Sequence, residues 1–178
     1  MSIIHIGHAD TKLGRFHVAV ENGAVLATQL PDDRRPELEM WLDRHRPGAQ
    51  LVEGGDPLLE NVAAQLTEWA AGERSDFDLP LADQGTAFQA AVWKALEAIP
   101  YGEVASYADV AAAIGKPGAA RAVGQANNRN PLAPFVPCHR VVTADGGLGG
   151  YGGGEALKVE MLKLEGVSVG PGGAVRTP

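Results

Sequence analysis

Phe16, Val18 and Val20 alternate with other residues in GRFHVAVENGAVLATQL, residues 14–30. Phe16 and Val18 begin a run with the two-residue period of a β-strand that buries one face. Asn22-Gly23 lies between two apolar runs and can adopt the positive φ angles of a tight turn. The stretch therefore predicts a β-hairpin.

Two later stretches of the first half have apolar residues at helical spacing instead. They are RPELEMWLDRH, residues 35–45, and DPLLENVAAQLTEWAAGE, residues 56–73. Pro57 suits a first helical turn, and Gly72 suits a helix end. A connector that contains proline follows, and we place a domain boundary near Asp83. The first half thus predicts a small α/β unit.

The second half is predicted to be mainly helical. Residues 86–99, TAFQAAVWKALEAI, carry one apolar stripe, which we assign to core packing, and Thr86 suits the N-cap of this helix. Residues 106–131 then predict two short helices in succession. Ser106 and Asp109 form an N-terminal capping pattern for the first of them.

Gly115 ends the first short helix, and Pro117 begins the second, which runs to about Asn127. Two short helices joined by a few residues that include glycine fit a DNA-binding helix-turn-helix, although many compact helical domains contain such a pair. The second helix consists mostly of Ala and Gly around one long cation, Arg121. Such a helix either presses into a narrow groove with the arginine projecting, or packs internally with a solvated arginine. The spacing alone leaves both open.

The predicted fold class is α+β with two domains. Residues 1–83 are expected to form an N-terminal α/β domain and residues 84–170 a C-terminal domain. Residues 171–178 are expected to be a disordered tail unrelated to function.

The composition of the chain indicates in which cellular compartment the protein is expected. The chain is 45% hydrophobic and 21% charged, as in ordinary globular proteins. No apolar run is long enough to span a membrane, and the first residues lack the pattern of a signal peptide. A single cysteine cannot form an internal disulfide, so we expect a cytoplasmic protein without membrane contact.

The net charge of −7 argues against a nucleic-acid partner, but its distribution weakens the objection. The acidic excess lies in residues 1–83, whereas the charges of residues 84–178 nearly balance. Between positions 106 and 143 the charged residues are Lys116, Arg121, Arg129 and Arg140 against the single acid Asp109. Any contact with a polyanion is therefore expected in the second domain, with moderate, salt-sensitive affinity.

Cys138 is the only cysteine, and it lies in NPLAPFVPCHRVV, residues 130–142. A lone cysteine is often a small buried hydrophobe, but a reactive one needs nearby positive charge or a proton acceptor, and His139 and Arg140 follow directly. Adjacent residues of a strand point to opposite faces, so either the chain bends here or a water joins Cys138 to His139. The three prolines of the segment favour a bend. Spacing does not identify a third group to orient the histidine.

A glycine-rich stretch, GGLGGYGGG at residues 146–154, follows the cysteine. Its position between the cysteine segment and a predicted helix at residues 155–166 argues against a flexible linker. A glycine-rich loop with one aromatic residue, Tyr151, can close over a flat ligand and offer backbone N–H groups. It is not a phosphate loop, because no Gly-Lys-Ser/Thr follows.

Four motifs together resemble those of the O6-alkylguanine-DNA alkyltransferases, also called methylated-DNA–protein-cysteine methyltransferases. They span about half of the chain, from Thr86 to Gly166, in the order and spacing of that family. The motifs are FQAAVWKALEAIPYGEVASYADVAAAIG, ARAVGQANNRNP, VPCHRVV and GYGGG. The first half resembles the variable N-terminal domain of the family on weaker grounds.

The resemblance implies a ribonuclease H-like N-terminal domain and a C-terminal winged helix-turn-helix-like domain that carries the active site. It also implies that the protein binds duplex DNA in the minor groove, flips O6-alkylguanine and transfers the alkyl group irreversibly to Cys138. Each molecule would act once, without a cofactor. The implied partner is double-stranded DNA containing O6-alkylguanine, with O4-alkylthymine as a further substrate, and the implied state is a monomer.

The resemblance further implies a role for each matched residue. Cys138 takes the alkyl group, His139 deprotonates it through a water, and Glu165 orients His139. Asn130 ties the recognition helix to the active-site turn. Tyr107 helps to rotate the nucleotide and hydrogen-bonds the flipped base.

Other matched residues contact DNA or the base. Arg121 fills the space that the flipped base leaves, and backbone groups of Cys138 and Val141 read the guanine edge. Further DNA contacts are implied for Ser106, Tyr107, Ala120 and Gly124. The substrate pocket is implied to include Pro137, Val141, Tyr151, Gly152 and Gly153.

The chain departs from the family at several positions. Some members hold a structural zinc in the N-terminal domain, but His5, His8 and His17 have no cysteine near them, so we expect no metal. Gly152 stands where many members have a polar side chain, so only a backbone contact is expected there. Ala133 stands where a proline can line the alkyl pocket, which leaves the size of the accepted adduct open.

Two other functions fit parts of the pattern. A protein of the same fold that only recognises alkylated guanine would lack the cysteine, which is present here. A hydrolase built on Cys138, His139 and Glu165 would need an oxyanion hole and would leave the helix-turn-helix unexplained.

Overall fold

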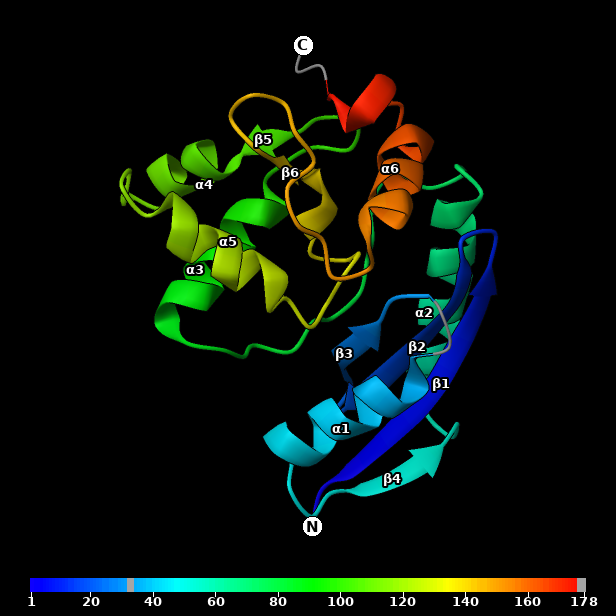
Figure 1. Ribbon diagram of the computed structural model, residues 1–178. Helices are drawn as coiled ribbons and strands as arrows, with labels where there is room; N and C mark the ends of the chain where they lie inside the picture. Colours follow the sequence, from blue (N-terminus) through cyan, green and yellow to red (C-terminus); the bar gives the residue numbers. More distant parts are fainter. Residues whose placement is uncertain (32–33, 176–178) are drawn as a thin grey trace. The chain divides into compact units, whose positions relative to one another are not determined.

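The computed structural model describes residues 1–31 and 34–175 of the chain. It divides into two compact units, Met1–Ala82 and Asp83–Pro178. Helices and strands occur in both units (Figure 1). The predicted mixture of α and β structure is therefore confirmed.

The first unit is built on a four-stranded sheet with the order β3-β2-β1-β4. Its strands are β1 (Ile3–Thr11), β2 (Gly14–Glu21), β3 (Ala24–Gln29) and β4 (Gln50–Glu53). β4 pairs parallel to β1, and the other pairs are antiparallel. β2 and β3 form the predicted hairpin, in which Asn22 and Gly23 have φ angles of 52° and 75°. β1 and β4 lie outside the predicted elements.

Two helices cover opposite faces of this sheet, α1 (Arg35–His45) and α2 (Pro57–Ala70) (Figure 1). Successive residues of a strand point to opposite faces, and β2 shows the result. Ala19 packs in the apolar cluster of α1, whereas Phe16 meets Trp69 of α2 edge-on, with 6.5 Å between the ring centroids. Both helices lie where the apolar spacing predicts them.

In the second unit, helices outnumber strands, and the strands form a two-stranded parallel sheet. Reciprocal capping boxes begin two of its helices, at Thr86 with Gln89 and at Ser106 with Asp109, and Thr86 and Ser106 are the N-caps that the sequence predicts. The elements are α3 (Ala87–Glu97), β5 (Ala105–Ser106), α4 (Tyr107–Ala113), α5 (Ala120–Asn128), the 3-10 helix η1 (Cys138–Arg140), β6 (Val141–Val142), α6 (Glu155–Leu164) and the 3-10 helix η2 (Pro171–Gly173).

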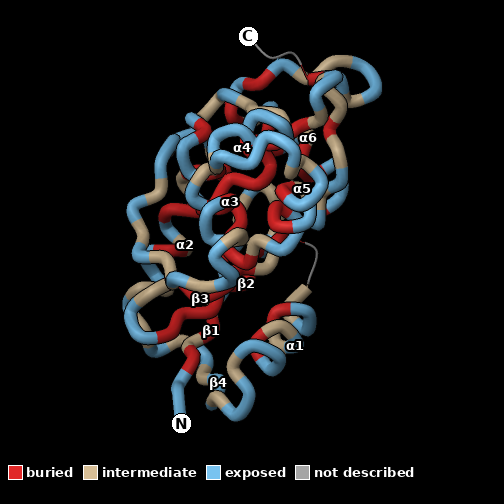
Figure 2. Tube along the Cα trace, turned by 90° about the vertical axis from the view of Figure 1, so that its left-hand side faces the viewer, coloured by how far each residue is buried: buried red, intermediate tan, exposed pale blue. Residues whose placement is uncertain are grey.

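The short helices α4 and α5 pack against α3. α5 begins at Ala120 rather than at the predicted Pro117, because the residues before it form a turn. It buries Val123 and Ala126, and the Ala126 carbonyl accepts a hydrogen bond of 2.9 Å from the indole nitrogen of Trp93. Asn127 is the other buried residue of this helix, and the remaining positions are partly or fully exposed (Figure 2). α5 is therefore amphipathic and not internal, which decides one alternative that the sequence leaves open.

β5 and β6 connect parts of the second unit that are far apart in sequence. Ala105 pairs with Val141, and Ser106 pairs with Val142. Ser106 is also the N-cap of α4, so α4 begins directly beside the strand that follows Cys138. This pairing fixes the start of the helix pair relative to the cysteine.

The end of the described chain, up to Val175, makes backbone and side-chain contacts, whereas the sequence predicts a disordered tail for residues 171–178. The N–H of Val175 donates to the carbonyl of Gly146 at 2.8 Å, and Val175 forms a bridge with Val169. The Val175 side chain is buried in an apolar cluster with Val142, Leu148, Leu162 and Val167. Burial of this valine offsets the entropy cost of ordering a glycine-rich turn. Residues 176–178 lie outside the described residues.

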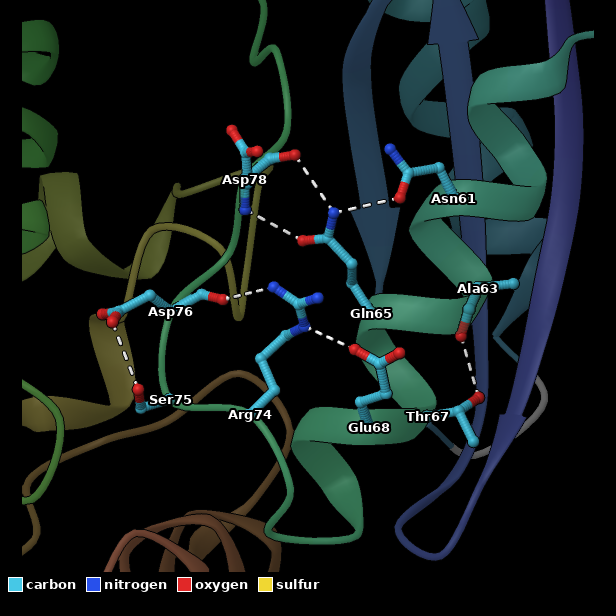
Figure 3. A network of polar contacts seen from close by, with 9 residues as sticks. All are labelled: Asn61, Ala63, Gln65, Thr67, Glu68, Arg74, Ser75, Asp76 and Asp78. Carbon is cyan, nitrogen blue, oxygen red and sulfur yellow. Dashed lines mark hydrogen bonds and ion pairs between the residues drawn. The ribbon is translucent and has the colours of Figure 1, made fainter.

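A side-chain amide holds the connector at the end of the first unit against α2 (Figure 3). Nε2 of Gln65 donates to the Asp78 carbonyl at 3.1 Å, and Oε1 of Gln65 accepts from the Asp78 N–H at 2.9 Å. Gln65 is buried and also donates to Asn61 at 3.0 Å. Arg74 adds a contact of 2.6 Å to Glu68. The connector is thus part of the first unit and not a free linker.

Replacing Gln65 with Ala is expected to lower the free energy of unfolding of the first unit by about 1–3 kcal/mol, because one truncation removes all three of these hydrogen bonds. Amide exchange at Asp78 should accelerate. Denaturant unfolding followed by fluorescence, together with hydrogen exchange, measures both effects. Glu60→Ala, an exposed change on the same helix, is the control. Equal losses in the two variants would contradict a stabilising amide clamp.

Candidate active site

The cysteine segment is a buried, bent stretch of chain. Every residue from 131 to 142 is buried. The chain turns at η1, where the Cys138 N–H donates to Val136 at 2.8 Å and the Arg140 N–H donates to Pro137 at 3.0 Å. Successive side chains of a 3-10 helix diverge by about 120°, unlike those of a strand. The bend that the prolines predict is present, and Cys138 and His139 do not point to opposite faces of a strand.

The thiol of Cys138 is surrounded by polar groups that favour its ionised form. Burial raises the pKa of Cys138 above its ordinary value, and it outweighs a hydrogen bond from Asn130, the positive charge of Lys158 and a hydrogen bond from Tyr151, which lower the pKa. Asn130 also donates from Nδ2 to the Val136 carbonyl at 2.7 Å, which fixes its amide beside the turn. The environment therefore opposes a charged sulfur through burial and supports it through specific contacts.

Lys158 lies outside the predicted site residues, yet it is fully buried, and its charge acts on Cys138. Its ammonium donates to the backbone carbonyls of Val141 and Leu148 and lies 5.7 Å from the centre of the Tyr151 ring. Burial lowers the pKa of Lys158 to about 8, and the charge of Cys138 opposes this shift. The lysine thus joins the cysteine, the following strand and the glycine-rich loop.

A signal for Lys158 is present in the sequence. Met161 and Leu162 follow it by three and four residues, and both are fully buried. Residues at these spacings share a helix face, so Lys158 occupies a core position of α6. A lysine is rarely buried without a partner, and such a position therefore points to a functional or structural contact.

His139, Arg140 and Glu165 form a buried charge cluster. Nε2 of His139 lies 3.0 Å from Oε1 of Glu165. Arg140 donates from Nε to Oε2 of Glu165 at 2.8 Å and from Nη2 to Oε1 at 2.9 Å. Burial alone would raise the pKa of Glu165, but hydrogen bonds and charges of His139 and Arg140 outweigh it and lower the pKa to about 2. Glu165 is therefore an ionised carboxylate in contact with the histidine.

The imidazole of His139 is poised as a neutral base. Burial lowers the pKa of His139 below its ordinary value, and this effect outweighs the opposing influence of Glu165. When the proton of the neutral ring is on Nε2, where Glu165 accepts it, Nδ1 carries a lone pair. That nitrogen can take up a proton.

Tyr107, the first residue of α4, lies between two glycines. A Cβ on Gly124 of α5 would lie 3.6 Å from its ring, and a Cβ on Gly149 would lie only 2.7 Å from its hydroxyl oxygen. Gly149 also has a φ of +68°, so glycine is required there on two grounds. Burial and the charge of Cys138 raise the pKa of Tyr107. The phenol therefore stays protonated, and the charge of the sulfur acts on it.

The outer side of α5 presents Arg121 among small residues. Arg121 and Ala122 are exposed, and Ala120 and Gly124 are partly exposed. Within the part of the chain that the structure describes, Arg121 makes no ion pair. Ser106 uses its hydroxyl to cap α4, so its side chain already has one partner.

The residues predicted for the substrate pocket differ in exposure. Pro137, Val141 and Gly153 are buried, Tyr151 is half-buried and Gly152 is exposed. The Tyr151 hydroxyl hydrogen-bonds the thiol, whereas the Val141 carbonyl accepts from the buried ammonium. A carbonyl oxygen has a second lone pair, so Val141 can still bond a base edge.

No group of three or more His, Cys, Asp and Glu side chains in residues 1–31 and 34–175 is arranged to hold a metal ion. Nδ1 of His5 lies 2.7 Å from the Gly54 carbonyl, and His17 is buried in β2. Over the same residues, no helix combines the length and the apolar character needed to cross a bilayer.

Residues 87–167 match the family model described as 6-O-methylguanine DNA methyltransferase, DNA binding domain. The constitutive methylated-DNA–protein-cysteine methyltransferase of Bacillus subtilis (strain 168) is 45% identical over 161 residues, which cover 90% of this chain and 94% of that protein. The chain belongs to the methylated-DNA–protein-cysteine methyltransferase family. A member from Mycobacterium leprae (strain TN) is 42% identical over 164 residues, 92% of this chain and 93% of that one.

Solved structures of this methyltransferase family have the same fold. The crystal structure of Mycobacterium tuberculosis O6-methylguanine methyltransferase has a TM-score of 0.76 and 40% identity, and the match covers 91% of this chain and 92% of that chain. Mycobacterium tuberculosis OGT in complex with DNA has a TM-score of 0.76 and 39% identity, over 92% of each chain. The predicted family, with DNA binding and methyltransferase activity in DNA repair, is confirmed.

The close contact between Gly149 and the Tyr107 hydroxyl can be tested with a matched control. Gly149→Ala should lower the free energy of unfolding by about 1–2 kcal/mol, because a side chain is strained at this positive φ. It should also slow methyl transfer by about tenfold, because the new Cβ displaces the phenol. Gly150→Ala, where a Cβ meets nothing within 4 Å, should change neither. Single-turnover rates and denaturation curves test this, and matching behaviour of the two variants would contradict it.

Proposed function

We propose that this methyltransferase removes the alkyl group from the O6 atom of guanine in duplex DNA and keeps it on Sγ of Cys138, once per protein molecule. One observation carries the proposal. Cys138 is the only cysteine of the sequence, and it lies in a buried site with a buried cation and a histidine–glutamate pair. A protein-cysteine methyltransferase needs a cysteine as acceptor, and this chain offers one. O4-alkylthymine is a second substrate.

The reaction is a displacement at a saturated carbon. His139, oriented by Glu165, takes the thiol proton through a bridging water. Sγ of Cys138 then attacks the alkyl carbon in line with O6, so that a carbon–sulfur bond forms as the carbon–oxygen bond breaks. The proton ends on the departing guanine. The thioether has no proton to lose, and no cofactor takes part, so the protein reacts once.

The groups around the sulfur stabilise its charge before the attack. Asn130 and Tyr151 do so through hydrogen bonds, and Lys158 does so as a buried cation. Asn130 also ties α5 to the turn through its bond to Val136. Tyr107 bonds the extruded base, since its raised pKa keeps it protonated.

The helix pair α4–α5 is the DNA-binding element. It lies in the minor groove, where Arg121 takes the place of the flipped nucleotide. The small residues Ala120 and Gly124, with Ser106, let the backbone approach the DNA closely. The flipped base enters a pocket formed by Pro137, Val141, Tyr151, Gly152 and Gly153. A ribonuclease H-like first domain and a winged helix-turn-helix-like second domain, in a cytoplasmic monomer, complete the proposal.

The proposal is tested by incubating the protein with duplex DNA that contains O6-methylguanine and measuring the protein mass. The expected result is one methyl group per molecule, located on Cys138. Cys138→Ser should abolish transfer while DNA binding stays nearly unchanged, since the hydroxyl is a far weaker nucleophile at neutral pH. Binding without a mass change in the unaltered protein would indicate a recognition protein. Repeated product release would indicate a hydrolase.

Arg121→Ala is expected to slow transfer from duplex DNA by roughly 10–100-fold, the loss of about 1–3 kcal/mol of stacking at the vacated base position. Reaction with free O6-alkylguanine base should stay near the original rate, because no base has to be extruded. Single-turnover rates on both substrates measure this. Arg44→Ala, an exposed change in the first unit, serves as the control. Equal slowing on duplex and free base would exclude the role of Arg121 in flipping.

A further inference from the structure

We infer that Arg140 is a positioning residue for the transfer reaction. It hydrogen-bonds both oxygens of Glu165, and it thereby keeps this carboxylate from holding His139 in its protonated, cationic form. The inference rests on the proposed function, in which His139 has to be neutral to accept a proton. Arg140 acts on the reaction through Glu165 and not by contact with the reacting atoms.

Each of the three nitrogens of the Arg140 guanidinium donates a hydrogen bond. Nε and Nη2 of Arg140 bind the two oxygens of Glu165, and Nη1 donates to the carbonyl of Ile99 at 2.7 Å. The guanidinium carbon lies 5.8 Å from the centre of the Tyr101 ring. These contacts fix the orientation of the planar guanidinium, and its two-point contact fixes the orientation of the Glu165 carboxylate as well. A lysine ammonium is a point charge and cannot reproduce both bonds.

One oxygen of Glu165 serves both neighbours. Oε1 lies 2.9 Å from Nη2 of Arg140 and 3.0 Å from Nε2 of His139. The carboxylate therefore orients the imidazole while its charge is shared with a permanent cation. A buried carboxylate without that cation would face the imidazole alone, and such a pair strongly favours proton uptake by the ring.

The charged groups around His139 come from the elements packed against η1. Burial lowers the pKa of His139, Glu165 raises it through a hydrogen bond and its charge, and the charges of Arg140 and Lys158 lower it. Cys138 and the phenols of Tyr101 and Tyr151 are the other titratable groups near this cluster. The titratable side chains of α3, Lys94 and Glu97, pair with each other at the surface. The other titratable residues of α6, Glu155, Glu160 and Lys163, are exposed.

The consequence is a defined pH range for the base. His139 accepts a proton only above its own pKa, so transfer falls off on the acid side of that value. Removing Arg140 removes an influence that lowers this pKa. The acid limb of the rate profile then moves to higher pH.

The experiment measures single-turnover transfer against pH, together with NMR titration of His139. Arg140→Gln is expected to move the acid limb and the His139 titration upward by about one pH unit. Arg140→Lys keeps the charge but loses the two-point contact, so a smaller upward shift is expected. Arg44→Gln, an exposed change in α1, should shift neither.

A double variant separates this role from a merely structural one. When Glu165→Gln is already present, adding Arg140→Gln should shift the acid limb clearly less than it does in the unaltered protein, because the part of the effect that Arg140 exerts through Glu165 is already gone. A rate lowered by the same factor at every pH, with His139 titrating as before, would overturn the inference. If Arg140→Gln does not fold, an acid limb of the pH–rate profile that does not move in Arg140→Lys would likewise overturn the inference. If Cys138 is never methylated, the proposed function fails, but the His139 titrations still test the effect of Arg140.

Discussion

A sulfur atom that has to ionise inside a protein needs compensating groups around it, and the second unit is arranged around this constraint. Burial raises the pKa of the Cys138 thiol. The groups that oppose this effect come from different elements: Asn130 follows α5, Tyr151 lies in the glycine-rich loop, and Lys158 lies in α6. These groups lie far apart in the sequence, so only the folded chain brings them to the sulfur.

The elements that local residues determine are predictable from the sequence. Asn22-Gly23 specifies the hairpin through its φ angles, and Thr86 and Ser106 specify helix starts through capping boxes. The strands that depend on distant partners are not. β4 has four residues, mostly exposed, and owes its pairing to β1, while β5 and β6 have two residues each. The contacts of Val175 are not predictable for the same reason, because its burial depends on residues that precede it by up to 33 positions.

The site shows the same division. Cys138 stands out in the sequence because it is the only cysteine, and the family resemblance supplies Glu165 and Tyr107. The two buried cations, Lys158 and Arg140, are not found that way. Lys158 lies on an apolar helix face, but its partners are backbone carbonyls. Arg140 follows a histidine, but its partner is a carboxylate 25 residues away. The spacing of residues in the sequence cannot show which groups compensate a buried charge, because only folding brings those groups next to it.

The short ladder between β5 and β6 has a consequence for which damaged bases can react. Backbone hydrogen bonds keep the first turn of α4 at one separation from the strand that leaves Cys138. In the proposed reaction, this fixed separation sets the depth to which a flipped nucleotide has to rotate. An adduct reacts only if rotation brings its carbon to that depth, so two lesions of equal chemical lability can differ in repair through reach alone.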